Sequence, residues 1–296
     1  MIYSATEPFC DWLDVTYNPV SDLVGSEFKT GILPTWLLHT GAVVLSSCLE
    51  KTVFRVGTHG TVVMQSNKRF NRISASGTSL AHFRALGIYM DFLSELSSEP
   101  HRVTRLDAAV DVSRDGADVF AECEATFTKS TAKLGRKELP VTWEKRVRED
   151  GRATGTCYLG HRTRARHTAR VYDKADEAFC KRGELLPPTA RYEVTARGER
   201  DRPSPTLRDA AEPLSLFWHI ASPTLLTAPV GVPAWVAGDG ESWTFKRPVL
   251  LPAEIVEKRI GYNPDLDLIA EVASKDGQGG LKRMLRLIAQ KYDIEI

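Results

Sequence analysis

The feature that most restricts the fold is the alternation of polar and apolar side chains in two segments far apart in the chain. In residues 104–112, "TRLDAAVDV", the even-numbered positions from 106 are apolar, whereas the odd-numbered ones carry an arginine and two aspartates. In residues 190–197, "ARYEVTAR", the odd-numbered positions are Arg, Glu, Thr and Arg. A period of two is that of a β-strand with one buried face. Both segments are therefore expected to be strands with one charged face.

The remaining elements follow from periodicity and from turn residues. Further strands are expected at residues 10–17, 139–143, 156–159 and 168–172, with a hairpin over 52–57 and 61–66. Helices are expected at residues 80–96, 117–128, 174–181, 207–220, 263–274 and 281–292. The first of these helices is predicted to be continuous, with Thr78 or Ser79 as its cap.

A change of composition predicts a domain boundary near residue 198. The segment "GERDRPSPT" is charged and rich in proline, which is typical of a connector. We therefore expect two domains, one over residues 1–198 and a smaller, mainly helical one over residues 199–296. The last helix of the second domain has a basic face, which would suit a hairpin or duplex of nucleic acid.

Composition restricts the cellular setting. With 42% apolar and 26% charged residues the chain is globular, and no apolar stretch approaches the roughly 20 residues of a membrane-spanning helix. The first ten residues lack the pattern of a secretory signal. The five cysteines form no C-x-x-C pair and are odd in number, so reduced thiols in a cytoplasmic protein are expected.

Charge is distributed unevenly along a chain whose net charge is only +1. Residues 133–174 contain 12 basic and 5 acidic side chains, a local excess of +7, so the rest of the chain sums to about −6. Such a concentration predicts a surface for a polyanion. Within it, the arginines at positions 162, 164 and 166 (Arg162, Arg164, Arg166) are expected to contact phosphates, and phosphate contacts position a nucleic acid without reading its sequence.

A tyrosine between two cations is the main candidate for covalent chemistry. If residues 168–174 are extended, Arg170, Tyr172 and Lys174 share one side of the strand. Nearby cations lower the pKa of a phenol and can hold a phosphate under attack. A divalent metal bound by carboxylates would polarise the same phosphate. Without the neighbouring motifs, Tyr172 would be read as a tyrosine that fills a half-buried strand position.

The same block resembles the replication initiation factors of rolling-circle plasmids and filamentous phages, a family that includes related conjugative relaxases. The matching segments are "RLDAAVD", "YLGHRTRARHTARVYDK" and "RYEV", supported by "DWLDVTY" and "RISASG" nearer the N-terminus. The resemblance spans residues 11–197, and its middle block is the specific part. It implies an α+β protein with an antiparallel sheet, related to the HUH endonucleases and flanked by helices.

The resemblance also implies an activity and a set of site residues. A tyrosine would cut one strand at an origin, keep the 5′ phosphate and leave a 3′ hydroxyl for a polymerase. Tyr172 is the implied nucleophile, ahead of Tyr158 and Tyr192, with Arg170 and Lys174 beside it. Asp107, Asp111 and Glu193 are the implied metal ligands.

The metal and the partners follow from the same resemblance. No His-x-His pair occurs in the chain, so oxygen ligands would favour Mg²⁺ or Mn²⁺. Asp107 and Asp111 lie about 13 Å apart along a strand, so one is expected to face Glu193 and the other an arginine such as Arg105. Single-stranded or hairpin origin DNA is the implied partner, with host helicase, replication proteins and a second copy of the chain as further candidates. A relaxase with the same chemistry and a non-catalytic DNA-binding regulator are the alternatives.

Overall fold

The structure is a computed structural model that describes residues 4–17, 32–48, 50–66, 70–127, 131–134, 137–162, 165–198 and 204–225. The helices expected at residues 263–274 and 281–292 lie outside the described residues, as does most of the expected C-terminal domain. None of the helices within the described ranges is long and apolar enough to cross a bilayer.

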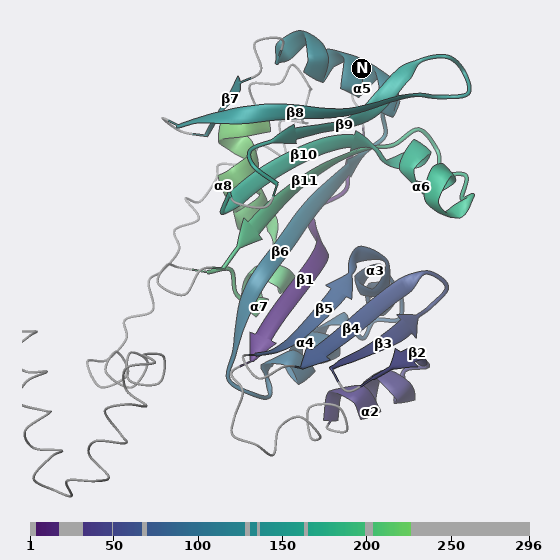
Figure 1. Cartoon of the computed structure of the whole chain (residues 1–296), viewed down its shortest axis with the longest axis vertical. Helices are drawn as coiled ribbons and strands as arrows, with labels where there is room; N and C mark the ends of the chain where they lie inside the picture. The colour runs from purple at the N-terminus through teal and green to yellow at the C-terminus, as the bar shows by residue number, and fades with distance from the viewer. Residues whose placement is uncertain are drawn as a thin grey trace, which may run out of the picture. The chain divides into compact units, whose positions relative to one another are not determined.

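Eleven strands form one antiparallel sheet. They are β1 (Phe9–Tyr17), β2 (Val43–Ser47), β3 (Lys51–Val56), β4 (Gly60–Ser66), β5 (Asn71–Ser76), β6 (His101–Val112), β7 (Thr131–Leu134), β8 (Lys137–Val147), β9 (Ala153–Leu159), β10 (His167–Asp173) and β11 (Ala190–Arg197). Their order is β2-β3-β4-β5-β1-β6-β11-β10-β9-β8-β7, which places the long strand β6 at the centre (Figure 1).

The described helices are α2 (Ile32–His39), α3 (Gly77–Ala85), α4 (Tyr89–Ser97), α5 (Gly116–Thr126), α6 (Lys174–Arg182), α7 (Leu207–Ala211) and α8 (Leu214–Leu225). Together with the sheet they confirm the α+β class and the antiparallel arrangement predicted from the sequence. The alternating segments 104–112 and 190–197 are strands β6 and β11, and they pair with each other.

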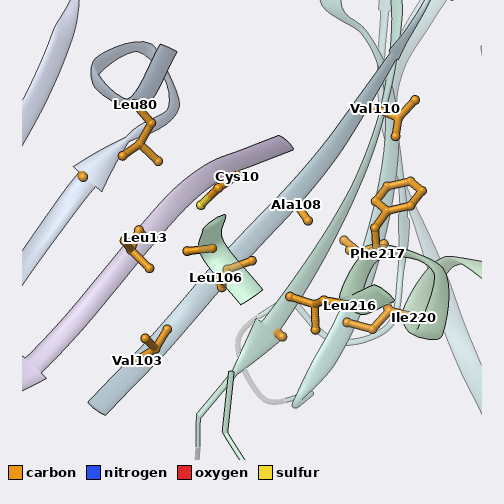
Figure 2. Packing of buried hydrophobic residues seen from close by; sticks show 14 of the residues in the cluster. Cys10, Leu13, Leu80, Val103, Leu106, Ala108, Val110, Leu216, Phe217 and Ile220 are labelled. Atoms are coloured by element: carbon orange, nitrogen blue, oxygen red, sulfur yellow. The ribbon is translucent and has the colours of Figure 1, made fainter. Parts of the chain in front are cut away.

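The apolar face of the sheet forms the core with the helices. The even-numbered residues of β6 from Leu106 onward are buried, and Figure 2 shows Val110 of β6 beside Phe217 of α8. Helix α5 contacts β9 and β10, whereas α3 contacts β1 and β4. Burial of a large apolar side chain such as Phe217 contributes about 1.5–3 kcal/mol, so this face holds the helices on the sheet.

The prediction of one continuous helix over residues 80–96 is wrong. Helix α3 ends at Ala85 and α4 begins at Tyr89, because Gly87 between them adopts a left-handed backbone with φ of +74°. The cap is Ser76, whose hydroxyl accepts a hydrogen bond from the backbone N–H of Ser79. The apolar period therefore continued across a turn in which the chain changes direction.

The helix expected at residues 207–220 is also divided. Helix α7 ends at Ala211, α8 begins at Leu214, and Pro213 lies in the turn between them. Both helices lie on the C-terminal side of the boundary expected near residue 198, yet both contact the sheet. Helix α7 contacts β1 and β6, and helix α8 contacts β6, β10 and β11. Residues 204–225 therefore belong to the packed sheet structure.

Candidate active site

The charged face of the sheet brings together residues that are far apart in the sequence. In the register of the sheet, Arg191 of β11 lies between Asp111 of β6 and Tyr172 of β10. Two residues further along β11, Glu193 lies opposite Arg170. Residues opposite one another in neighbouring strands share a face, so these side chains form one polar cluster.

Tyr172 lies at the centre of this cluster. Its side chain is 6% exposed, and its hydroxyl donates a hydrogen bond of 3.3 Å to Oε2 of Glu193. The guanidinium carbon of Arg170 is 5.0 Å from the centre of the tyrosine ring, and Nζ of Lys174 is 5.7 Å from it. The structure thus places the tyrosine between two cations, as the strand pattern predicts.

The pKa of Tyr172 differs from the expectation. Burial raises it well above the usual value of 10.0, and the negative charge of Glu193 adds to the increase. Arg191 and Arg170 oppose that increase without overcoming it. The cations do lower the pKa of Tyr172, as expected, but the prediction of a pKa below the usual value is wrong because burial has the larger effect. The phenol therefore stays neutral at ordinary pH.

Glu193 is the group suited to accept the phenolic proton. It is 1% exposed, and its pKa is raised to about 8. Burial is the main cause, and the negative charges of Asp107 and Asp11 act in the same direction, whereas Arg170 opposes the increase. Nη2 of Arg170 lies 2.6 Å from Oε1 of Glu193. A carboxylate whose pKa lies near neutrality, in contact with a hydroxyl, has the properties of a general base.

The pKa of Glu193 predicts a specific pH dependence of stability. The carboxyl group of Glu193 keeps its proton up to about pH 8 in the folded chain and releases it near pH 4.5 in the unfolded chain. Its contribution to the free energy of unfolding is therefore complete below pH 4.5 and is lost as the pH rises to about 8. We expect wild-type stability to fall across this window relative to a Glu193→Gln variant, measured by urea unfolding at several pH values. Glu212→Gln, at a position 76% exposed, is the control and should leave the wild-type profile unchanged. Parallel profiles for wild type and Glu193→Gln would contradict the assignment.

The two aspartates of β6 are each held by an arginine. Asp107 accepts hydrogen bonds of 2.9 and 2.5 Å from Arg105, and Asp111 accepts two of 2.6 and 2.7 Å from Arg191. Arg191 also donates a bond of 2.8 Å to Asp11 of β1. Sequence reasoning missed Asp11 and Arg191 as members of the site, although Arg191 shares the polar side of its strand with Glu193.

These carboxylates do not fit a divalent cation as they are arranged. Asp107, Asp111 and Glu193 each carry an arginine partner, which occupies the oxygens that a metal would need. No group of three His, Cys, Asp or Glu side chains suited to a metal ion occurs in the part of the chain that the structure describes. A requirement for Mg²⁺ or Mn²⁺ stays a prediction.

The arginines predicted to contact phosphates lie around the turn after β9. Arg162 pairs with Glu144 of β8, and Arg164 lies outside the described residues. The backbone N–H of Arg197 donates to the carbonyl of Arg166 at 2.8 Å, and its guanidinium donates to the carbonyl of Arg162 at 2.5 Å. Arg197 thereby ties both described ends of this turn to β11, a role the sequence did not indicate.

The two other tyrosines of the block lie in different surroundings. Tyr192 is 2% exposed and belongs to the apolar core. Tyr158 donates a hydrogen bond of 2.8 Å to Glu144, and the guanidinium carbon of Arg162 lies 4.1 Å from the centre of its ring. Tyr158 therefore has a carboxylate and a cation beside it, as Tyr172 has.

A second ionic cluster fixes the end of β10. Asp173, directly after Tyr172, is buried and caps α6. Arg148 bridges Asp173, at 3.4 Å, and Asp115, the cap of α5, at 3.0 Å. A Cβ atom at Gly116 would lie 2.3 Å from Cγ of Asp173, so the first turn of α5 approaches closely only because this residue is glycine. These contacts fix Asp173, the residue that follows Tyr172 in β10.

Comparison with known proteins extends the description of the fold. No family model and no curated protein sequence matches the chain. The structure is similar to that of a rolling circle replication initiator protein from Geobacillus stearothermophilus, at 15% identity and a TM-score of 0.50, over 75% of this chain and 86% of that one. At this identity the similarity establishes the fold alone.

Two other solved structures align over much of the chain but superpose poorly. DynU16, from the dynemicin biosynthetic locus, is 14% identical with a TM-score of 0.21, over 74% of this chain and 96% of that one. The di-domain ARO/CYC protein BexL is 15% identical with a TM-score of 0.23, over 60% of this chain and 73% of that one.

Proposed function

We propose that this protein initiates rolling-circle replication by nicking and rejoining single-stranded origin DNA. The observation that carries the proposal is the contact of Tyr172 with Glu193 and Arg170 on the charged face of the sheet. The similarity of the fold to a replication initiator supports it. Metal use, host helicase and replication proteins, and assembly as a homodimer are further parts of the proposal that rest on the resemblance in sequence.

The chemistry follows from the atoms in contact. The hydroxyl oxygen of Tyr172 attacks a backbone phosphorus, its proton passes to Glu193, and the bond from phosphorus to the 3′ oxygen breaks. The 3′ oxygen takes a proton from water, and the 5′ phosphate stays on the tyrosine. Arg170 and Lys174 hold the non-bridging oxygens, on which negative charge increases. Because Glu193 must be ionised to accept the proton, nicking should increase as the pH rises through about 8.

Access to the tyrosine depends on Arg170. The guanidinium side chain of Arg170 is 33% exposed, whereas Tyr172 and Glu193 beneath it are almost completely buried. A phosphate attracted to the exposed guanidinium would weaken its pairing with Glu193 and come close to the hydroxyl. Substrate binding and activation of the general base are thus coupled in this proposal.

A non-catalytic DNA-binding regulator is the second candidate. The burial of Tyr172, with its raised pKa, favours this reading because a structural tyrosine needs neither solvent access nor a low pKa. A conjugative relaxase would use the same residues as a replication initiator, so the site does not separate those two.

Detection of a covalent adduct tests the proposal. The full-length protein is incubated with single-stranded oligonucleotides tiled across the DNA that flanks its gene, with Mg²⁺, with Mn²⁺ and with a chelator. We expect an adduct that resists denaturation on a gel, and its loss with the chelator would support a metal. Binding without any adduct on every oligonucleotide would overturn the nicking function in favour of the regulator.

Phosphate contacts near the turn after β9 predict a change in salt dependence. The triple replacement of Arg162, Arg164 and Arg166 by alanine should weaken binding to any single strand about equally and flatten the slope of log K against log salt by up to roughly two units. Affinity is measured over a series of salt concentrations. Arg208→Ala, 88% exposed on α7, is the control. An unchanged slope with loss of origin preference would mean that this segment reads bases.

A further inference from the structure

The charged face continues from the candidate site across the N-terminal half of the sheet. Three residues of β1, Trp12, Asp14 and Thr16, lie opposite residues of β5 on one side and of β6 on the other. The row of Thr16 continues through β4 to Lys51 of β3, and the row of Asp14 continues through β4 to Val53 of β3. The residues between them, such as Leu13, are buried in the core, so the three rows form the opposite surface.

Trp12 is an aromatic residue within these three rows. It is half-buried, its Nε1 donates a hydrogen bond of 2.7 Å to Oδ1 of Asp14, and the guanidinium carbon of Arg105 lies 5.1 Å from the ring centre. The hydrogen bond satisfies the polar atom of the indole and fixes the ring. Little rotational freedom would then be lost when a planar ligand stacks on the surface.

The charge of the three rows favours an anionic ligand. The charged side chains in register there are four basic ones and two acidic ones: Lys51, Arg72, Arg102, Arg105, Asp14 and Asp107. Arg105 and Asp107 pair with each other, which leaves an excess of positive charge distributed over several strands. This surface lies outside residues 133–174, where the sequence concentrates its positive charge.

We propose that this surface binds single-stranded DNA on its way to Tyr172, with a base stacked at Trp12 and phosphates held by the surrounding arginines. A planar aromatic ring within a basic surface is how proteins bind single strands without regard to sequence. In the register of the sheet, Trp12 lies level with Thr168 of β10, three strands away, and Thr168 is four residues before Tyr172. At about 4.8 Å per strand and about 3.3 Å per residue, Trp12 and Tyr172 are roughly 20 Å apart. The proposal rests on the proposed function for its substrate.

Stacking at Trp12 is tested by comparing two oligomers with the same phosphate backbone. Labelled oligodeoxythymidylate and an abasic oligomer of equal length are titrated against wild type, Trp12→Leu and Trp12→Phe. We expect Trp12→Leu to weaken binding of oligodeoxythymidylate by roughly five- to 150-fold, the range for loss of one stacked base, and to leave binding of the abasic oligomer unchanged. Trp12→Phe retains a ring and should stay close to wild type. An equal loss on both oligomers, or no loss on either, would overturn the proposal.

Tryptophan fluorescence gives an independent measurement that does not depend on affinity. Trp143 is the matched control because it contacts Phe120 of α5, on the helix-covered face, with ring centres 5.4 Å apart. Oligodeoxythymidylate should quench the wild type and Trp143→Phe and lose that effect in Trp12→Phe. Quenching that persists in Trp12→Phe would place the stacked base elsewhere and contradict the proposal.

Both measurements report binding, so their failure is distinct from failure of the nicking function. If no adduct forms but Trp12→Leu loses affinity only for the oligomer with bases, the surface is established and the nicking function is rejected. If an adduct forms while both Trp12 variants behave as wild type, nicking is retained and the stacking site is rejected.

Discussion

Replacing Tyr172 by phenylalanine is expected to abolish both the covalent adduct and strand nicking while affinity for single-stranded DNA stays within about twofold of wild type. Only the hydroxyl is lost, and the ring with its neighbouring cations Arg170 and Lys174 remains. The buried carboxylate of Glu193 loses one donor but keeps the guanidinium of Arg170 at 2.6 Å. Adduct formation is measured on denaturing gels and affinity by fluorescence anisotropy.

Matched variants make this result interpretable. Tyr192→Phe changes a hydroxyl within the apolar core and should leave the adduct intact. An adduct that persists in Tyr172→Phe would show that another residue is the nucleophile. Tyr158 would then be the next candidate, since it also lies beside a carboxylate and an arginine.

Arg191→Met is expected to destabilise the fold by about 3–5 kcal/mol, the usual cost of removing one partner from a buried ionic network. The Arg191 side chain is 9% exposed and bonds Asp111 and Asp11 at once, so two carboxylates lose the cation that they share. Because these residues come from three adjacent strands, the loss should be felt across the centre of the sheet. Urea unfolding measures the change.

Two comparisons distinguish the effect of breaking the ionic network from the effect of removing one positive charge. Arg208→Met removes an exposed arginine whose ion pair is worth at most about 1 kcal/mol, and it should have a minor effect. Combining Arg191→Met with Asp11→Asn and Asp111→Asn removes the unpaired charges and should recover part of the loss. A single variant as stable as wild type would refute the structural role of Arg191.

The sequence by itself determined the strands of the candidate site and the orientation of their residues. The period of two in residues 104–112 and 190–197 assigns Asp107 and Glu193 to polar faces and Val110 to the core, as observed. It likewise places Arg170 and Tyr172 on one side of β10. These features are local, because the direction of a side chain along an extended strand depends only on its position in the alternation.

Local patterns were insufficient where the chain changes direction. The apolar period across Leu86 and Met90 predicted one helix, yet these residues are 53% and 60% exposed beside the turn at Gly87. A helical spacing of apolar residues indicates which side chains are buried, but it does not show whether the backbone continues in one helix. The left-handed backbone at Gly87 decides this, and a glycine within a helical pattern only permits it.

Tertiary structure alone decided which residues meet. Asp11 and Arg191 are 180 residues apart and bond because β1 and β11 lie on either side of β6. Packing of the sheet also buries Tyr172, and that burial raises a pKa that the flanking cations would have lowered. Strand order and burial are set by the packing of the whole sheet against its helices. The sequence therefore determined the chemical groups on each face, and the tertiary structure determined their partners and their protonation.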